Sequence, residues 1–414
     1  MRTSTKVERL GVALSALMAL CSPWTAATFG QDQAAARRAE ARALAQQLLI
    51  VDTHIDAPSR LLTKGEDLSR RTAKGQFDYE RAREGGLDLP FMSIYTSSSL
   101  EGTGKAKPKA EQLIAVVETL AATYPDKFVV VRSVADVERE QSGGRVMLAL
   151  GMENGSPIEG SLENLRAFSR RGVRYLGLAH AKNNHLADAS YDKKRRWNGL
   201  SPFGKTVVKE MNRLGMMVDV SHLTDDAVDQ VLAISTAPVI ASHSSCRHFT
   251  PGFERNLDDE RIRKIGAGGG VIQINFGSEF LTDSAYSYDA RKRRAVEEHA
   301  RDMGWGRESQ RTREYAREYT RAHPFPYATV ADVVDHLDHI IAIAGEEHAG
   351  LGSDFDGVGD SLPIGLKDVS MYPSLIEEML SRGYTRERIA GICGGNLMRV
   401  WAAVETVARN GGAR

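Results

Sequence analysis

The sequence of 414 residues is poor in cysteine and has no excess of charge of either sign. Its three cysteines are too few for a disulfide scaffold, so core packing must stabilise the fold. Whether Cys246 and Cys393 pair stays open at this stage. The 54 basic and 54 acidic residues cancel, which argues against nucleic acid or an anionic membrane as a partner. A content of 42% apolar residues excludes a disordered chain and allows a substantial core.

The N-terminus also lacks an apolar run long enough to span a bilayer. Leu10–Cys21 is a largely apolar run of roughly a dozen residues, too short for a transmembrane helix. It follows three basic residues and precedes small residues that suit cleavage after Ala27. We therefore predict a signal peptide over residues 1–27, export to the periplasm or the medium, and no membrane span after its removal. A lipid anchor on Cys21 is the weaker alternative because Leu20 is bulky.

Eight short apolar segments follow, separated by stretches with helical periodicity. This alternation of strands and helices predicts parallel pairing through right-handed crossovers. Eight such units fit an α/β fold of the closed (β/α)8, or TIM-barrel, type, and a doubly wound open sheet is the alternative. The predicted strands are Leu48–Val51, Leu87–Tyr95, Val146–Met152, Val173–Ala179, Met216–Val220, Pro238–Ala241, Val271–Phe276 and Ala349–Ser353.

The predicted barrel spans residues 48–405. A leader helix over residues 28–47 precedes it, and a polar tail, residues 406–414, follows it. The segment 283–322 interrupts the rhythm before the last strand, and it is highly charged and helix-prone. We predict a helical insertion there, either a solvated excursion or a lid over the site.

Polar residues that suit metal binding stand where the predicted strands end. The carboxyl ends of barrel strands meet at one mouth, where active sites are built. Imidazoles and carboxylates without a thiolate suit zinc and other first-row divalent metals. Three histidines, one aspartate and one glutamate would make five ligands, more than one catalytic zinc needs. We therefore predict two ions roughly 3.5–4 Å apart that share a bridging carboxylate. The strand-end residues are His54, Asp56, Glu153, His180, His222, His243 and Asp354.

The remaining histidines lack this placement. His336 and His339 recur at helical spacing on a polar face, and we predict that both face solvent. We expect structural roles for the others, which are His185, His248, His299, His323 and His348.

Several motifs occur in an order that resembles one known family. The sequence is similar to the membrane (renal) dipeptidases, which are binuclear zinc peptidases, and to an exported bacterial member in particular. It lacks the disulfide cysteines and the lipid-anchor signal of the animal members. The resemblance implies two zinc ions in each subunit and allows a homodimer. The matching motifs, from about Leu48 to Trp401, are DTHIDAP, LALGMENGSPIEGSLENLRAFSRRGVRYLGLAHAKNN, GMMVDVSHLTDDAVDQVL, VIASHSSCR, ERNLDDE, DHLDHI and GLGSDFDGV.

The resemblance also implies roles for matching residues. His180 would contact the substrate carbonyl and steady the tetrahedral intermediate. Arg255 would hold the terminal carboxylate of the substrate, and an arginine fork suits that group. Asp354, rather than the nearby Asp356, would transfer the proton. The implied metal ligands are His54 and Asp56 for the first zinc, Glu153 as the bridge, and His222 and His243 for the second zinc.

The function predicted from these features is hydrolysis of a dipeptide by a water that bridges two zinc ions. The substrate would be L-Xaa-Xaa, or a dipeptide with a D-residue at its C-terminus. An alternative with the same chemistry is an amidohydrolase-like enzyme for lactones, N-acyl amino acids or β-lactams, and the insertion could change the substrate range. A binding protein that has lost turnover is a third and weaker hypothesis, because every expected ligand is present.

Overall fold

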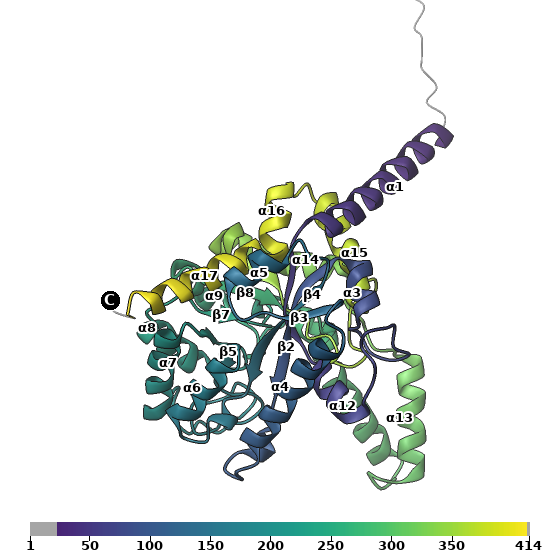
Figure 1. Cartoon of the computed structure of the whole chain (residues 1–414). Coiled ribbons are helices and arrows are strands. Elements are labelled where there is room, and N and C mark those ends of the chain that lie inside the picture. The colour runs from purple at the N-terminus through teal and green to yellow at the C-terminus, as the bar shows by residue number, and fades with distance from the viewer. Residues whose placement is uncertain (1–22, 412–414) are drawn as a thin grey trace, which may run out of the picture.

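Residues 23–411, the part of the chain that the computed structural model describes, form a barrel of parallel strands surrounded by helices (Figure 1). Eight strands pair in the order β1-β2-β4-β5-β6-β7-β8-β9, and a parallel bridge between Ile55 and Phe355 brings the first beside the last. Strand β3 pairs only with β4. The strands are β1 (Ile50–Ile55), β2 (Leu87–Tyr95), β3 (Phe128–Val130), β4 (Val146–Glu153), β5 (Val173–Gly177), β6 (Met217–Asp219), β7 (Ile240–Ala241), β8 (Val271–Ile274) and β9 (Ala349–Leu351).

Helices connect the strands and cover the outside of the barrel (Figure 1). They are α1 (Pro23–Gln47), α2 (Ala57–Lys64), α3 (Tyr79–Gly85), α4 (Ala106–Thr123), α5 (Val134–Glu140), α6 (Leu162–Arg170), α7 (Pro202–Leu214), α8 (Asp225–Ile234), α9 (Asp259–Ala267), α10 (Ser278–Leu281), α11 (Asp283–Tyr286), α12 (Tyr288–Asp302), α13 (Gln310–Ala322), α14 (Val330–Ala344), α15 (Tyr372–Ser381), α16 (Arg386–Ala390) and α17 (Asn396–Arg409).

The predicted (β/α)8 fold with a helical insertion is confirmed, and all eight predicted strands are present. Their bounds differ by a few residues: β1 begins at Ile50 and runs to Ile55, so His54 belongs to the strand itself. The short strand β3 was not predicted, because three residues carry too little periodicity to be recognised. Helix caps agree with the sequence: the Thr224 side chain accepts a hydrogen bond from the Ala227 amide at the start of α8.

Side chains on β4 alternate between the two faces of the barrel wall. Met147 and Ala149 belong to the cluster that fills the barrel interior, whereas Leu148 and Leu150 pack outward against the helices. The same alternation carries Glu153, the last residue of β4, to the inside at the carboxyl end. The strand therefore aims this carboxylate into the mouth.

Strand β1 also directs a side chain into the mouth, but it does so through a shift in its pairing with β2. Val51 packs inside the barrel, and strict alternation from it would also turn Ile55 inward. The pairing with β2 shifts between Asp52 and Ile55, and Ile55 packs on the outside. This local shift is what lets His54 face the other strand ends.

The opposite end of the barrel is closed by apolar side chains of α17. Leu397, Val400, Trp401 and Val404 are fully buried and join the interior cluster. The rings of Trp401 and Phe91 meet edge to face with centroids 5.5 Å apart. Residues 406–409 continue this helix, so the polar tail predicted from residue 406 is helical at its start.

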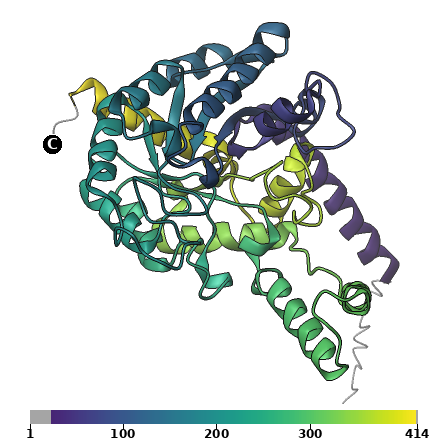
Figure 2. The same ribbon diagram turned by 90° about the horizontal axis from the view of Figure 1, so that it is seen from below.

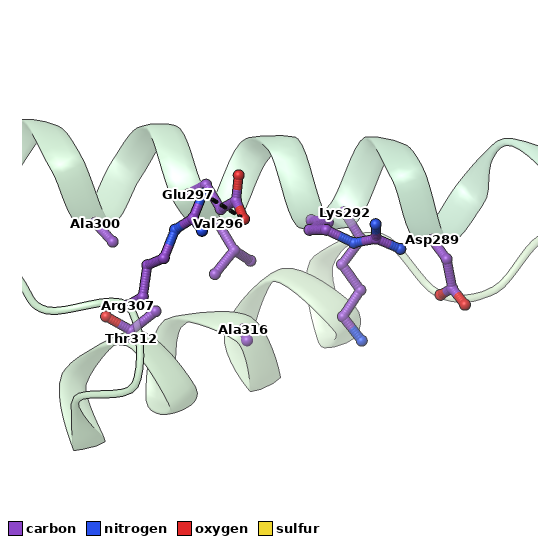
Figure 3. Close-up of a pocket in the computed structure, with 9 residues that line it drawn as sticks. Asp289, Lys292, Val296, Glu297, Ala300, Arg307, Thr312 and Ala316 are labelled. Atoms are coloured by element: carbon purple, nitrogen blue, oxygen red, sulfur yellow. Dashed lines mark ion pairs between the residues drawn. The ribbon is translucent and has the colours of Figure 1, made fainter.

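The predicted insertion is a helical hairpin that extends away from the barrel (Figure 2). Helices α12 and α13 enclose an open groove of about 340 Å³, which Arg307 and Glu297 cross with an ion pair of 3.2 Å (Figure 3). Tyr288 at the start of α12 donates a hydrogen bond from its hydroxyl to the His323 carbonyl and ties the base of the hairpin together. This arrangement favours the solvated excursion over the lid.

Some of the predictions made from the sequence concern residues that the structure does not describe. Residues 1–22, with most of the predicted signal peptide and Cys21, lie outside the described range, as do residues 412–414. Helix α1 runs through Ala27 and projects from the barrel at its start (Figure 1). Within residues 23–411, no helix combines the length and the hydrophobicity that crossing a bilayer requires.

Whether Cys246 and Cys393 pair is answered by the structure, in which both are buried, free thiols.

The prediction that His336 faces solvent is wrong, since this side chain is fully buried. Its Nδ1 accepts a hydrogen bond from the Cys246 amide at 2.9 Å, and its Nε2 donates one to the Leu281 carbonyl at 3.0 Å. Helical spacing could not reveal this environment, because the segments that cover α14 are distant in sequence.

Candidate metal centre

The carboxylate of Glu153 lies at the centre of the barrel mouth. Its Oε2 is 3.5 Å from His54 Nε2. Its Oε1 is 3.0 Å from His222 Nε2 and 3.3 Å from His243 Nε2, and His180 Nε2 lies 3.5 Å from the same oxygen. Each oxygen of Glu153 therefore faces a different set of ring nitrogens.

The other predicted ligand atoms lie within reach of this carboxylate. Asp56 Oδ2 is 3.5 Å from His54 Nε2, on the side of Glu153 Oε2. Three sets of side chains bring their ligand atoms within 4.8 Å of one another, and no other such set occurs among the side chains of residues 33–411. The sets are His54, Glu153 and His243; Glu153, His180 and His222; and His54, Asp56 and Asp354. The structure thus gathers all seven strand-end residues at one place.

Their electrostatic environment suits cation binding. Burial raises the pKa of Glu153, but His180, His54, His222 and His243 together hold it well below its usual range, so the carboxylate is ionised. Burial is the main cause that lowers the pKa of His222 and of His243 well below the usual value, so both rings are neutral. Neutral imidazoles and an ionised carboxylate are the forms that bind divalent metals.

One buried atom points directly to a missing ligand. His54 Nε2 is buried and has no hydrogen-bond partner in the structure. Leaving a buried polar atom unsatisfied costs on the order of 1–3 kcal/mol, so such atoms are rare in native proteins. A cation bound between His54, Asp56 and Glu153 would satisfy this nitrogen. The donor set therefore fits two ions of zinc or a similar metal that share Glu153.

The backbone at the mouth is held in an uncommon conformation. His222 has a φ of 68° and Asp354 a φ of 64°, both in the left-handed region. Asn154, next to Glu153, has a φ of 75°. Side chains other than glycine lose about 1–2 kcal/mol in this region. These strand ends therefore accept a local penalty that turns their side chains toward the centre.

Asp354 and Asp356 have separate tasks, although only one residue lies between them. Asp354 Oδ2 accepts a hydrogen bond of 2.7 Å from the Asn275 amide, and burial raises the pKa of Asp354 to about 7. Asp356 forms an ion pair of 3.1 Å with Arg60 and accepts a hydrogen bond of 2.8 Å from the Gln76 amide. Asp356 thus holds the loop before α3, and Asp354 is the aspartate that faces the metal ligands.

Arg255 lies against the histidines, deeper than the sequence suggested. It is 3% exposed, and its guanidinium donates to Ser244 Oγ and to the His243 carbonyl, each at 2.7 Å. Its Nε and Nη2 also lie 3.1 and 3.2 Å from the two ring nitrogens of His222. A metal ion on His222 Nε2 would replace the contact between this nitrogen and Nη2, which also donates to the His243 carbonyl.

The centre opens into a pocket of about 440 Å³, within the usual size range for small-molecule sites. Sequence patterns did not identify its other walls, which include Ser59, Tyr95, Tyr191, Phe280 and Val358. Tyr95 ends β2, and the others lie in the segments that follow β1, β5, β8 and β9, which is the signal that could have indicated them. In the described part of the chain, no residue of the segment 283–322 lines this pocket.

Comparison with known proteins relates this centre to peptidases. Residues 38–413 match the family model described as membrane dipeptidase (peptidase family M19). The chain is 34% identical over 346 residues to Dipeptidase aclJ of Aspergillus oryzae, covering 81% of this chain and 72% of that protein. It is 31% identical over 379 residues to Dipeptidase 3 of Mus musculus, covering 89% of this chain and 67% of that protein.

Solved structures show the same similarity. The probable dipeptidase PvdM from Pseudomonas aeruginosa superposes with a TM-score of 0.78 at 27% identity, over 89% of this chain and 98% of that one. A metallopeptidase from Rhodobacter sphaeroides, solved with a phosphinate mimic of the dipeptide L-Ala-D-Ala, gives a TM-score of 0.69 at 26% identity, over 86% of this chain and 99% of that one.

Proposed function

This chain belongs to the membrane dipeptidase family, peptidase family M19, and is by that membership a metal-dependent dipeptidase; we propose that it works with two zinc ions per subunit. The first zinc would be held by His54 and Asp56, the second by His222 and His243, and Glu153 would bridge the two. The observation that carries this proposal is the division of Glu153, whose two carboxylate oxygens face separate sets of ligands.

When bound, the two ions supply an activated water and polarise the scissile carbonyl. The residues of the chain position the substrate and move the proton. His180, which is partly exposed at the pocket wall, would donate a hydrogen bond to the carbonyl oxygen as negative charge develops there. Asp354, which lies at the pocket wall beside His54 and Asp56, would pass a proton to the leaving amine.

Arg255 would bind the terminal carboxylate of the substrate. Its buried guanidinium borders His222 and lies over the ring of Phe280, which lines the pocket, at 5.4 Å. A carboxylate bound there would stand at a set distance from the metal pair. That spacing would select dipeptides over longer chains.

The first experiment is metal analysis combined with a panel of dipeptide stereoisomers. We expect two zinc ions per chain and release of free amino acids from L-Xaa-L-Xaa dipeptides. The ligand in the Rhodobacter sphaeroides structure, a phosphinate mimic of L-Ala-D-Ala, supports including dipeptides with a C-terminal D-residue. A protein that holds two zinc ions and cleaves no dipeptide would contradict the proposal.

The alternative substrates, lactones, N-acyl amino acids and β-lactams, are tested by Arg255→Ala. If a dipeptide carboxylate binds Arg255, the variant loses about 2–4 kcal/mol of transition-state stabilisation in kcat/KM for dipeptides. Arg247→Ala is the matched control, since Arg247 pairs with Asp225 and, unlike Arg255, forms no hydrogen bond with a candidate metal ligand. An unchanged kcat/KM for the best substrate in Arg255→Ala would exclude carboxylate recognition by this residue.

We also propose that the protein is exported and loses residues 1–27. The basic and then apolar composition of this leader supports the proposal. N-terminal sequencing of protein from the periplasm or medium is expected to begin at residue 28, whereas a lipid on Cys21 would support the anchored alternative. A homodimer, as the family resemblance allows, is tested by light scattering.

A further inference from the structure

Two buried hydrogen-bond relays lie behind the candidate metal ligands. We propose that Tyr175 and Asp219 are positioning residues that fix the proton of His54 and His243 on Nδ1. Each would thereby leave the Nε2 lone pair directed at the metal centre. The inference deepens the proposed function, because it assumes that these two Nε2 atoms bind metal.

The first relay runs from His54 to a backbone carbonyl. The Tyr175 hydroxyl lies 2.9 Å from the Thr53 carbonyl, which can only accept, so the hydroxyl must donate to it. The hydroxyl oxygen is also 2.8 Å from His54 Nδ1. Since the only hydroxyl proton is already used, Nδ1 must carry a proton and donate it. In the neutral ring, the form that binds a metal, His54 Nε2 is then unprotonated, and this buried nitrogen has no hydrogen-bond partner among the protein atoms.

The second relay runs from His243 to a carboxylate. Asp219 accepts hydrogen bonds from the amides of Ser242 and Ser221 at 2.8 and 3.0 Å, and from Ser242 Oγ at 2.7 Å. Ser242 Oγ is 2.7 Å from His243 Nδ1, while its contact with Ser221 Oγ is longer, at 3.4 Å. Because the Ser242 hydroxyl donates to Asp219, His243 Nδ1 must donate to Ser242.

The surrounding strands leave room for both relays. A Cβ on Gly151 of β4 would overlap the Tyr175 ring. A Cβ on Gly177 of β5 would come within 3.3 Å of Asp219 Oδ2, which is tighter than ordinary packing. Tyr175 and Asp219 are 0% and 1% exposed. Burying a polar group costs free energy unless it is hydrogen-bonded, as both of these are.

The two relays serve different sides of the bridging carboxylate. His54 faces Glu153 Oε2, and His243 faces Oε1. His222 has Arg255 rather than an acceptor beside its Nδ1, so it has no such relay. Tyr175 should therefore govern the ion held by His54 and Asp56, and Asp219 the ion held by His222 and His243.

Asp219→Asn is the sharpest test, because asparagine can keep the two backbone hydrogen bonds through its carbonyl oxygen. Its amide nitrogen would donate to Ser242 Oγ, which would turn the serine hydroxyl toward His243 Nδ1 and force the ring proton onto Nε2. We expect a ¹⁵N NMR spectrum of histidine-labelled protein to show this change of tautomer at His243. Zinc titration should show one of the two sites weakened by about 10–100-fold.

Tyr175→Phe tests the other relay, since it removes the acceptor for His54 Nδ1. The zinc site that Asp219→Asn leaves intact should be the one that weakens, again by about 10–100-fold. Asp188→Asn and Tyr384→Phe are matched controls: Asp188 caps backbone amides of the loop 196–199, and the Tyr384 hydroxyl bonds to Asp338 on α14. Both should keep two unaltered zinc sites.

Failure of the inference is distinguishable from failure of the proposed function. Wild-type tautomers at His54 and His243 in both test variants would overturn the inference, even if the enzyme cleaves dipeptides. The NMR measurement does not depend on zinc, so it tests the relays even if the wild type proves inactive. If Asp219→Asn does not fold, Ser242→Ala interrupts the same relay and leaves the Asp219 side chain in place.

Discussion

The two ends of the barrel are built in opposite ways. At the end where the strands begin, Trp401 and Val400 of α17 close the interior with apolar contacts. At the end where the strands finish, the interior holds buried imidazoles and the carboxylate of Glu153. The first arrangement contributes stability through burial, and the second gathers ionisable groups in the forms that suit a bound cation. The same strands therefore serve stability at one end and chemistry at the other.

The backbone shows the same division. In the described part of the chain, all the left-handed residues other than glycine lie in loops that follow strand ends: Asn154, Glu159, Asn198, His222, Asp354 and Asp356. The loops that lead into the strands use glycine for this conformation, at Gly86, Gly144, Gly172, Gly215, Gly269 and Gly345. Glycine adopts it without a steric penalty. The loops at the mouth use glycine as well, for example at Gly102, Gly160 and Gly199, but at His222 and Asp354 they keep side chains that the site needs and accept the strain.

The largest expected effect comes from breaking the polar end at Glu153. Glu153→Gln removes the anion shared by the two ligand sets, and we expect a loss of about 5 kcal/mol, roughly 10⁴-fold, in kcat/KM. The melting temperature of the zinc-free protein should not fall, because the variant no longer buries that charge. Glu210→Gln is the control: Glu210 is a poorly exposed carboxylate paired with Arg213 outside the mouth, so its loss should leave kcat/KM unchanged. Two tightly bound zinc ions in Glu153→Gln would contradict the proposed bridge.

The apolar end should respond in the opposite way. Trp401→Ala leaves a large cavity beside Phe91, and we expect about 4 kcal/mol less free energy of unfolding with kcat unchanged per folded molecule. Urea denaturation measures the first quantity, and kinetics at low temperature measures the second. Trp305→Ala, in the protruding hairpin, should have a smaller effect on stability. A selective loss of kcat in Trp401→Ala would mean that the two ends are not independent.

The third prediction concerns His336, a buried histidine outside the mouth whose two ring nitrogens are both hydrogen-bonded to backbone groups. Burial, which disfavours the charged ring, lowers the pKa of His336 from 6.5 to about 4, and its Nδ1 already accepts a hydrogen bond from a backbone amide. The folded state thus favours the neutral ring. This contribution is fully present above pH 6.5 and is lost as the pH falls from 6.5 to 4, by about 3 kcal/mol.

The measurement is the free energy of unfolding in urea at several pH values between 7 and 4. His336→Gln cannot titrate, so its stability should fall less steeply across this interval than that of the wild type. His339→Gln is the control, since His339 lies on the same helix but near the surface, beside Asp259. Parallel pH profiles for wild type and His336→Gln would refute the assignment.

The smallest effect is expected on the outer helices, which belong to neither end. Thr329 and Asp332 form a capping box at the start of α14. Thr329→Ala should cost about 1 kcal/mol of stability and leave zinc binding unchanged. Thr320→Ala on α13, whose hydroxyl bonds only to the preceding turn, should change stability by less than about 0.5 kcal/mol. Equal losses in the two variants would remove the cap as the cause.

Much of the fold and of the candidate site follows from local pattern. The apolar segments at Leu87–Tyr95 and Val271–Phe276 correspond to β2 and β8, and their spacing predicted a parallel barrel. The strand-end rule also selected seven side chains that lie together at the mouth. The burial of His336 and the contacts of Arg255 could not be predicted, because segments distant in the sequence determine both.

The order of strands and helices, and the kind of side chain that stands at each strand end, can be read from the amino-acid sequence alone. This is possible because periodicity and residue type act over a few neighbouring residues. Which oxygen of Glu153 faces which histidine could be learned from the folded barrel alone, and the fold agrees with the choice of Asp354 over Asp356. It alone also placed Tyr175 and Asp219 behind the ligands. These choices depend on distances of a few ångströms between strands that are far apart along the chain, and closing the barrel is what sets those distances.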